Sequence, residues 1–433
     1  MKKLDVWSKP LSETKVAIFG MGYVGLTFAL ALIQYGARVL GVDKNISVVN
    51  SLSDCKTDIL EPGIETKLKK AILEGALKVV DQIDSVLASD IDVYVVTVGT
   101  PLREQRIDQN AVREVISSIS DIMKENSAII LRSTLEVGTT RNLARPLLQN
   151  SGKQYFLAMC PERTIEGNAI SEISSLPQIV GGVDELSSKL IGKFFSLFCS
   201  EVVLFDNPES AEIIKLANNT YRDLMFGFAN ELSELCGALG LDSRHIIAGA
   251  NYKYPRSNIA QPGPSGGPCL TKDPWILYES GKKLDVDFQI AKAARRTNEN
   301  YVSKFLKKNL VQSIQNIKKV SCLGLSFKGS PETRDIRGSA ILDILNFFED
   351  NKGVTIYGFE PAGRVELVGL KQSESIDECL IDSDLVVILN NSKFFEDIEA
   401  KIIQLTSSNA IVLDFWGTVK RDALRIHRDL RIW

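Results

Sequence analysis

KVAIFGMGYVG, residues 15–25, decides the first part of the fold. A short apolar run leads directly into Gly20, Gly22 and Gly25, and an amphipathic stretch then continues to Tyr35. In such a strand–turn–helix unit the first glycine permits the tight turn, the second lets a pyrophosphate approach the backbone, and the third allows close helix–strand packing. Glycine-rich turns also serve packing alone, but here the preceding strand and the following helix predict a dinucleotide site at the helix N-terminus.

The next apolar run, RVLGVD (38–43), ends in an acidic residue, Asp43. It lies about twenty residues beyond the glycines, where a carboxylate can bond both hydroxyls of a ribose. An acidic side chain there disfavours a 2′-phosphate, so the predicted cofactor is NAD rather than NADP. Lys44 follows directly, and its ammonium would instead attract such a phosphate.

Short buried-looking runs alternate with helical patterns in two separate parts of the chain. DVYVVTV (92–98) and AIILRST (128–134) continue the first part, and the rhythm returns after Lys318 with KVSCLGLSF, VTIYGF (354–359), DLVVILN (384–390) and AIVLDFW (410–416). Strands that alternate with helices favour parallel sheets. Between these parts, apolar residues follow helical spacing from Asn207 to about Leu241, which is longer than most globular helices.

The predicted fold is therefore α/β, with two Rossmann-like open parallel-sheet domains joined by a long central helix. The expected domains are an N-terminal dinucleotide-binding domain (1–206), a central helical domain (207–312) and a second α/β domain (313–433). The stretch NYKYPRSNIAQPGPSGGP (251–268) is rich in Pro and Gly and is expected to form a long irregular loop, a type of segment that is often functional.

Composition excludes several classes of protein. The chain has 433 residues, with 51 Lys and Arg against 54 Asp and Glu, so its net charge is −3. Such a balance provides no basic field for coating nucleic acid. The start lacks the apolar core of a signal peptide, and no run approaches the roughly 18 apolar residues of a membrane span, so a cytoplasmic protein without a membrane partner is expected.

Cysteine and histidine usage narrows the chemistry. Seven cysteines are scattered far apart, which suggests reduced thiols rather than a disulfide framework. With only His245 and His427 and no CxxC pair, no metal site is expected. Catalysis is then expected to use Cys, Lys, carboxylates or a bound cofactor.

The stretch GGPCLTKDP, residues 266–274, has two readings. In the first, Asp273 caps a helix whose first residue is Pro274, and Cys269 is merely a small buried side chain. In the second, a thiol lies in a Gly-rich loop beside Lys272 and just before a helix start, where the cation and the helix dipole lower its pKa and favour the thiolate. The residues alone do not separate these readings.

Four further residues carry groups that suit a reaction centre. Lys215 and Asn219 are four apart on the predicted helix and share a face. Such a pair is usually solvated surface, but Lys215 lies inside an apolar pattern, and the two side chains together are suited to donate to a developing oxyanion. Glu162 follows Cys160 and Pro161 in a turn, and Thr134 lies at the carboxyl end of a strand, where open α/β sheets bind ligands.

Seven motifs in one order resemble the UDP-glucose/GDP-mannose dehydrogenase family, and they cover nearly the whole chain. They are VAIFGMGYVGL, VGTP, LRSTLEVGTT, CPERTIEG, KLANNTYRDLMFGFANE, QPGPSGGPCLTKDPW and LGLSFKGSPETRDIRGS. The resemblance implies NAD-dependent oxidation of a nucleotide sugar at C6 to the uronate, for surface polysaccharide synthesis. It also implies a homodimer or higher homo-oligomer built on the central helix.

The resemblance assigns roles to individual residues. It implies that Cys269 is the nucleophile and that its catalytic neighbours are Lys215, Asn219, Asp273, Glu162 and Thr134. The implied NAD contacts are Gly20, Gly22, Tyr23, Val24, Gly25, Asp43, Thr100, Thr134, Lys272 and Arg337. The implied contacts with the UDP-sugar are Glu162, Arg163, Lys215, Asn219, Arg256, Asn258, Gly266 and Lys328.

The motifs also bear on the choice of sugar. CPER (160–163) and RSNIAQPGP (256–264) resemble the UDP-N-acetylmannosamine and UDP-N-acetylglucosamine dehydrogenases, because the glucose branch typically has an aromatic residue in place of Arg163. Against this, CLTKD (269–273) is closer to the glucose and mannose branches. A UDP-N-acetylhexosamine is expected. The alternatives are UDP-glucose, a two-electron 6-phosphogluconate or β-hydroxyacid type of reaction, and a nucleotide-sugar sensor on an inactive scaffold.

Overall fold

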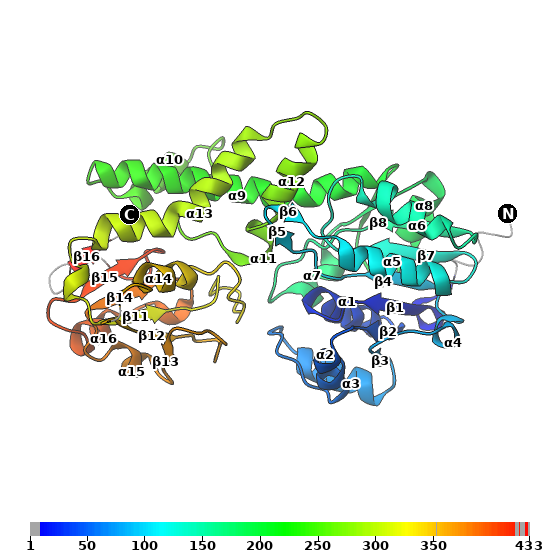
Figure 1. The fold of residues 1–433 in the computed structure, drawn as a ribbon, viewed down its shortest axis with the longest axis horizontal. Helices are drawn as coiled ribbons and strands as arrows, with labels where there is room; N and C mark the ends of the chain where they lie inside the picture. Colours follow the sequence, from blue (N-terminus) through cyan, green and yellow to red (C-terminus); the bar gives the residue numbers. More distant parts are fainter. Residues whose placement is uncertain (1–8, 352, 421–423, 425–428, 432–433) are drawn as a thin grey trace. The chain divides into compact units, whose positions relative to one another are not determined.

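The computed structural model describes residues 9–351, 353–420, 424 and 429–431 (Figure 1). Its chain divides into two compact units. The N-terminal unit comprises Met1–Asn218 and Glu279–Val286, and the C-terminal unit comprises Asn219–Tyr278 and Asp287–Trp433. Each unit contains one large sheet of mostly or wholly parallel strands, so the predicted α/β class is confirmed.

The sheet of the N-terminal unit has eight strands in the order β10-β9-β8-β7-β4-β1-β2-β3. Their bounds are β1 Lys15–Phe19, β2 Arg38–Val42, β3 Leu77–Val80, β4 Val93–Val96, β7 Ser127–Leu131, β8 Tyr155–Met159, β9 Gln178–Gly182 and β10 Val202–Phe205. Strands β1, β4 and β7 run parallel at the centre, and their nearly continuous apolar residues are buried on both faces, as parallel sheets require. Strand β9 reverses direction and pairs antiparallel with β8.

Helices cover both faces of this sheet. They are α1 Tyr23–Gln34, α2 Ile46–Ser53, α3 Ile64–Leu73, α4 Ser85–Ala88, α5 Asn110–Ile122, α6 Arg145–Gln149, α7 Ala169–Ser175 and α8 Glu185–Phe195, and a short hairpin of β5 Leu102–Arg103 and β6 Arg106–Ile107 precedes α5. One core lies under α1, α3, α7 and α8, and a second lies under α5 and α6 on the other face. Loops at the carboxyl edge of the sheet are therefore left available for a ligand.

The long central helix is α9, Pro208–Ala238, and it confirms the helix expected from Asn207 onwards. The Asn207 side chain accepts the backbone N–H of Ser210 at 2.9 Å, which caps the start of the helix. Gly240, with φ of +70°, follows the last turn in the left-handed conformation that commonly ends helices. The first part of α9, up to Asn218, belongs to the N-terminal unit and the rest to the C-terminal unit.

The C-terminal unit combines further helices with a six-stranded parallel sheet of order β13-β12-β11-β14-β15-β16, drawn in yellow to red in Figure 1. The helices are α10 Ser243–Asn251, α11 Gly267–Leu270, α12 Asp273–Lys282, α13 Gln289–Leu310, α14 Ile341–Phe348, α15 Ile376–Leu380 and α16 Glu399–Leu405. The end of α12, from Glu279 onwards, belongs to the N-terminal unit. The strands are β11 Lys319–Leu323, β12 Thr355–Phe359, β13 Lys371–Gln372, β14 Leu385–Ile388, β15 Ile411–Asp414 and β16 Asp429–Arg431. Helices α13 and α14 cover one face, and α15 and α16 cover the other.

Residues 252–266, between α10 and α11, form no regular element, as their Pro and Gly content predicts. Among the residues that the structure describes, no helix is long and apolar enough to cross a membrane.

Candidate active site

The glycine-rich turn between β1 and α1 has the geometry of a phosphate-binding turn. Gly20 has φ of +94°, a backbone conformation that would be strained for any residue with a side chain. A Cβ on Gly25 would lie 1.9 Å from the Gly20 carbonyl oxygen, so only glycine lets α1 approach the strand this closely. A Cβ on Gly22 would meet nothing within 4 Å, so the turn is open where a pyrophosphate would approach.

A cleft of about 600 Å³ lies beside this turn, and Asp43 is part of its wall together with Gly20 and Gly22. The Asp43 carboxylate accepts the backbone N–H groups of Met21 at 2.7 Å and Asn45 at 2.9 Å, which fixes it at the end of β2. Lys44 lies 3.8 Å from Glu114, with both side chains exposed. An open glycine turn and a carboxylate at the ribose position are the features that NAD requires, so the residues present fit this cofactor.

Tyr23 and Val24 belong to the first turn of α1, and the Tyr23 side chain points toward a second loop. Its hydroxyl donates to the buried Glu61 carboxylate at 2.5 Å and accepts the backbone N–H of Gly167 at 2.9 Å. Burial and the Glu61 carboxylate raise the pKa of Tyr23 well above its ordinary value. The cofactor turn is thus connected to the loop that follows Glu162.

Thr100 and Thr134, both expected near the cofactor, are neighbours in the N-terminal unit. The Thr100 hydroxyl donates to the Thr134 carbonyl at 2.7 Å. Thr134 follows β7 and Thr100 follows β4, and these two strands are adjacent and parallel, so their carboxyl ends meet at one edge.

Glu162 is held by a partner that the sequence did not single out, Arg132. The Arg132 guanidinium donates to the Glu162 carboxylate and to the Gln178 side chain at 2.9 Å, and it stacks 4.3 Å from the Phe28 ring centroid. The other Glu162 oxygen accepts the backbone N–H groups of Arg163 and Thr164 at 2.7 and 2.8 Å. The sequence signal for this contact was a charged residue, Arg132, at the end of the otherwise apolar run AIIL (128–131).

The charge state of Glu162 follows from these contacts. Burial by itself raises the pKa of Glu162, but the Arg132 charge and the hydrogen bonds from Thr164 and Arg132 outweigh it, with a smaller contribution from the Lys215 charge. The pKa is lowered to about 2. Glu162 is therefore ionised throughout the neutral range. Lys215, whose charge contributes to this shift, is itself buried on α9, with 9% of its surface exposed.

Arg163 makes a contact within its own unit. Its guanidinium donates to the backbone carbonyl of Pro177, just before β9. This acceptor is a backbone carbonyl rather than a carboxylate. It lies within reach because β9 runs antiparallel to β8, so the start of β9 is found at the edge where β8 ends.

A second group of expected residues lies in the C-terminal unit, around Asp273 at the start of α12. The Asp273 carboxylate is fully buried. One oxygen accepts the Asn219 side-chain amide at 2.6 Å, and the other lies 2.8 Å from the Lys272 ammonium. Asp273 thus orients an amide from α9 and a lysine from the Cys269 segment at the same time.

Cys269 lies in the short helix α11 and is half-buried. The segment around it packs tightly on the loop 327–338. A Cβ on Gly266 would lie 2.1 Å from the Gly338 carbonyl oxygen, and one on Gly267 would lie 2.6 Å from the Phe327 ring. The backbone N–H of Gly267 donates to the Arg337 carbonyl at 3.0 Å. All seven cysteines are thiols rather than disulfides.

The remaining expected residues lie on more exposed parts of the C-terminal unit. The Arg337 guanidinium bonds the Asp335 carboxylate, with its Nε 2.9 Å from each oxygen. The Lys328 ammonium lies 5.6 Å from the Phe327 ring centroid. Arg256 stacks on Tyr254 in the irregular segment 252–266, and Asn258 in that segment is exposed.

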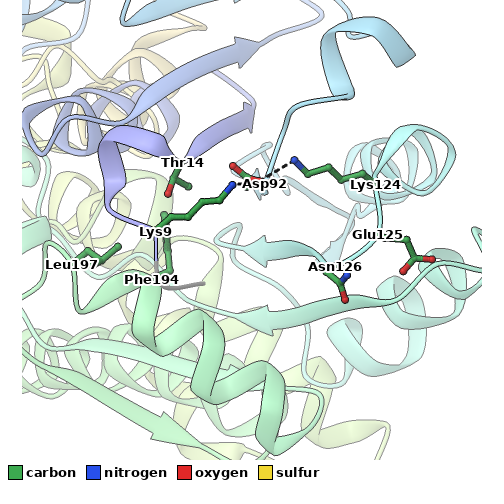
Figure 2. Close-up of a pocket in the computed structure, with 8 residues that line it drawn as sticks. All are labelled: Lys9, Thr14, Asp92, Lys124, Glu125, Asn126, Phe194 and Leu197. Atoms are coloured by element: carbon green, nitrogen blue, oxygen red, sulfur yellow. Dashed lines mark hydrogen bonds and ion pairs between the residues drawn. The ribbon is translucent and has the colours of Figure 1, made fainter. Parts of the chain in front are cut away.

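A different hollow lies at the amino edge of the N-terminal sheet and has no such features. Figure 2 shows Asp92 between Lys124, whose ammonium is 2.9 Å away, and Lys9, at 4.0 Å. The hollow has a volume of about 30 Å³, room for little more than a water molecule. Ligands of parallel sheets bind at the carboxyl edge instead. We therefore assign the ion pairs of Asp92 to holding the ends of strands together, and not to binding a ligand.

Comparison with known proteins agrees with this geometry. Residues 14–199 match the NAD binding domain of the UDP-glucose/GDP-mannose dehydrogenase family, residues 209–300 match its central domain, and residues 321–421 match its UDP binding domain. The chain belongs to the UDP-glucose/GDP-mannose dehydrogenase family. It is therefore an NAD-dependent nucleotide-sugar dehydrogenase with a UDP-binding domain.

Individual members of the family are similar along nearly their whole length. A UDP-N-acetyl-D-mannosamine dehydrogenase of Methanococcus maripaludis (strain C7) is 30% identical, with 89% of this chain and 88% of the relative covered. An NDP-N-acetyl-D-galactosaminuronic acid dehydrogenase of Ralstonia solanacearum is 27% identical over 93% of this chain and 95% of the relative. The solved UDP-D-ManNAc dehydrogenase of Pyrococcus horikoshii superposes with a TM-score of 0.85 at 28% identity, covering 97% of this chain and 99% of the other.

Proposed function

We propose that this enzyme oxidises the C6 alcohol of a UDP-N-acetylhexosamine to the uronate, in two successive oxidations through a thioester on Cys269. The observation that carries the choice of sugar is the similarity to dehydrogenases named for acetamido sugars, together with Arg163 directly after Glu162. When bound, NAD would supply the acceptor for the hydride that leaves C6 in each oxidation. The reaction consumes one water and gives two NADH per sugar.

The first oxidation converts the alcohol to an aldehyde. The hydroxyl proton passes to a base through water. Lys215, at 9% exposed, is proposed to donate to the oxygen at C6 with Asn219, whose amide is already oriented by Asp273. Donors held in place before the reaction stabilise developing negative charge without reorganising.

The second oxidation is proposed to pass through the thiol. The Cys269 sulfur adds to the aldehyde carbon, and the resulting thiohemiacetal loses a hydride to become a thioester. Water then attacks the thioester and releases the acid, which returns the thiol. Glu162 is suited to orient this water as an acceptor, because its pKa of about 2 keeps it ionised. Thr134 and Asp273 are proposed to assist.

The remaining expected contacts complete the proposed site. NAD is assigned to Gly20, Gly22, Tyr23, Val24, Gly25, Asp43, Thr100, Thr134, Lys272 and Arg337. The UDP-sugar is assigned to Glu162, Arg163, Lys215, Asn219, Arg256, Asn258, Gly266 and Lys328. The division into domains 1–206, 207–312 and 313–433 is retained as part of this proposal.

We also propose a homodimer through α9. Tyr221, Phe228 and Leu235 recur at seven-residue spacing on this helix and are 63%, 54% and 58% exposed. Residues seven apart share one face, so they form an apolar stripe that a second copy would cover. Reduced cysteines fit a cytoplasmic enzyme, and uronate formation fits the supply of surface polysaccharide precursors.

An NADH-release assay tests the proposal. The purified enzyme is given UDP-GlcNAc, UDP-ManNAc, UDP-GalNAc, UDP-glucose and GDP-mannose in turn, and NADH and the acid product are counted per sugar. The highest kcat/KM is expected with an acetamido sugar, with two NADH per uronate. Preference for UDP-glucose would favour the glucose branch, one NADH per sugar would favour the two-electron alternative, and binding without turnover would favour a sensor.

A further inference from the structure

Asp223 on α9 connects the two sides of the segment that carries Cys269. One carboxylate oxygen, Oδ1, accepts the Ser265 hydroxyl at 3.3 Å, on the amino side of the segment. The same oxygen accepts Nη1 of Arg295, from α13, at 2.6 Å. Nη1 of Arg295 also donates to the Leu270 carbonyl at 2.9 Å, on the carboxyl side. A single oxygen atom is thus bonded directly to the residue before Gly266–Cys269 and, through Nη1 of Arg295, to the residue after it.

The anchor is rigid because it is buried and supported by its surroundings. Asp223 and Arg295 are each 1% exposed. Asn298, one turn beyond Arg295 on α13, donates its amide to the Asp223 carboxylate at 2.9 Å and to the Asp223 backbone carbonyl at 2.8 Å. Further along the loop, the Asn230 side chain pairs with both backbone groups of Gly263, at 2.9 and 3.2 Å. The polar groups of α9 and α13 therefore hold the loop from one side.

The other side of the segment is held by tight packing. Gly266 and Gly267 have room only for hydrogen next to Gly338 and Phe327. The segment is thus confined between glycine contacts with the loop 327–338 and the Asp223–Arg295 pair. Loss of the pair would leave the glycine contacts intact but would release the two flanks of Cys269.

Stability alone does not account for this ion pair. Burying two charges costs several kcal/mol of desolvation, and apolar replacements of such pairs are often neutral or stabilising. In addition, Oδ2 of Asp223 is buried without a hydrogen-bond partner, and Nε of Arg295 makes no hydrogen bond and has only the Glu299 carboxylate at 3.4 Å. A buried pair in which two polar atoms make no hydrogen bond is better explained by the position that it imposes on Leu270 and Ser265.

Asp223 also lies one turn beyond Asn219 on α9, so both side chains project from the same face of the helix. Asn219 bonds Asp273, which follows the Cys269 segment, whereas Asp223 bonds one flank of that segment at Ser265 and reaches the other flank, at Leu270, through Arg295. We infer that Asp223 and Arg295 are positioning residues that hold the Cys269 thiol in register with the Asn219 amide for attack on the aldehyde.

The inference rests on the proposed function only in taking Cys269 as the nucleophile. Attack requires the reacting atoms to be about 3–3.5 Å apart and aligned, and a displacement of about 1 Å can cost about a hundredfold in rate. Loosening the segment would therefore lower kcat for acid formation. NAD affinity and the KM for the UDP-sugar would change little, because the pair touches neither ligand in this proposal.

The test uses two variants of the full-length enzyme. The double variant Asp223→Asn/Arg295→Met removes the ion pair and the bond to Leu270 without leaving a charge unpaired in the interior. Arg295→Lys keeps the positive charge on a shorter side chain, which does not place a nitrogen where Nη1 bonds both Asp223 and Leu270. The matched control is Arg296→Met, which removes an exposed arginine from the adjacent position of α13. Each protein is assayed for Tm, NAD affinity, KM, kcat, and the rate at which iodoacetamide alkylates Cys269, mapped by peptide mass spectrometry with half-buried Cys55 as the internal reference.

Both variants are expected to lose about ten- to a hundredfold in kcat, with KM and NAD affinity within about twofold of wild type. The alkylation rate of Cys269 relative to Cys55 should change several-fold, and Arg296→Met should match wild type. A folded variant of either kind with unchanged kcat and unchanged Cys269 alkylation would overturn the inference. If Cys269→Ser proved fully active, the nucleophile assignment would fail, whereas the alkylation ratio would still report whether the pair holds the segment.

Discussion

The guanidinium of Arg132, at the end of β7, donates to the carboxylate of Glu162, in the turn after β8, and both side chains are buried. Strands β7 and β8 are parallel neighbours with Leu131 opposite Met159, so the residues that follow them meet at the carboxyl edge of the sheet. Removing one partner of a buried ion pair is costly, because the other charge then stays buried without a counter-charge. The pair therefore controls both the ionisation of Glu162 and the stability of this edge.

The first prediction concerns acid stability. The pKa of Glu162 is about 2 in the folded protein, below its ordinary value of 4.5. Because the folded pKa is depressed, the stabilisation from Glu162 is present above about pH 4.5 and is lost as the pH falls toward 2. It amounts to about 3 kcal/mol. Denaturant unfolding of the Glu162→Gln variant, followed from pH 7 to pH 2, should show a weaker pH dependence than wild type over that window.

The matched partner variant is Arg132→Met. It leaves a buried carboxylate unpaired, so the free energy of unfolding should fall by about 3–5 kcal/mol at pH 7, and adding Glu162→Gln should recover part of the loss. Lys189→Met, which breaks an exposed pair with Glu185, serves as the control and should have little effect. Equal losses from Arg132→Met and Lys189→Met would contradict the assignment of a buried, functional pair.

The second prediction concerns the thiol. Cys269→Ser should bind NAD and the UDP-sugar with affinities within about twofold of wild type, but acid formation should fall by about a thousandfold or more, because a serine hydroxyl rarely ionises at this site. The acid is counted by mass spectrometry beside NADH release. Cys55→Ser, at the other half-buried cysteine, is the control and should retain activity. Full steady-state activity in Cys269→Ser would refute the covalent mechanism.

Local pattern explains why much of the fold was predictable. The glycine turn, Asp43 and α9 each depend on neighbours within about one element, so strand, turn and helix signals identify them directly. The pairing of Thr100 with Thr134 also follows, because it needs only that two adjacent parallel strands end at the same edge.

The contacts that the sequence did not reveal all depend on chain direction or on distant partners. Arg163 reaches the Pro177 carbonyl because β9 runs antiparallel to β8, and no side-chain pattern marks that reversal. Arg132 and Glu162 are 30 positions apart in the sequence, and Asp223 and Arg295 are 72 positions apart. Only Arg132, at the end of the apolar run AIILR (128–132), carried a visible signal, and a single sequence does not say which opposite charge it meets.

The third prediction concerns the cofactor. NAD should be strongly preferred over NADP, because the Asp43 carboxylate would repel a 2′-phosphate. The Lys44 ammonium lies 3.8 Å from the Glu114 carboxylate, which partly neutralises its charge. Asp43→Ser should therefore raise kcat/KM for NADP by about tenfold, and adding Glu114→Gln should raise it further by releasing Lys44. Comparable kcat/KM for NAD and NADP in the wild-type enzyme would contradict the role of Asp43.

The last prediction concerns Arg163, whose guanidinium already donates to the Pro177 carbonyl. Its other N–H groups are proposed to bond the acetamido oxygen or a phosphate of the substrate. Arg163→Leu should then raise the KM for the UDP-sugar and leave NAD affinity unchanged, with a loss of about 1.5–3 kcal/mol, or about ten- to a hundredfold in kcat/KM. Tm should also fall, because the Pro177 carbonyl loses its donor.

Arg163→Lys separates the two roles of this side chain. A lysine ammonium can replace the single bond to the Pro177 carbonyl, but it lacks the planar fork that serves a second, bidentate acceptor. Tm should therefore recover in Arg163→Lys while the KM for the UDP-sugar stays high. If the leucine variant loses Tm with an unchanged KM, Arg163 only holds the loop to β9. If the wild-type enzyme in addition prefers UDP-glucose to every acetamido sugar, the CPER motif does not mark specificity in this chain.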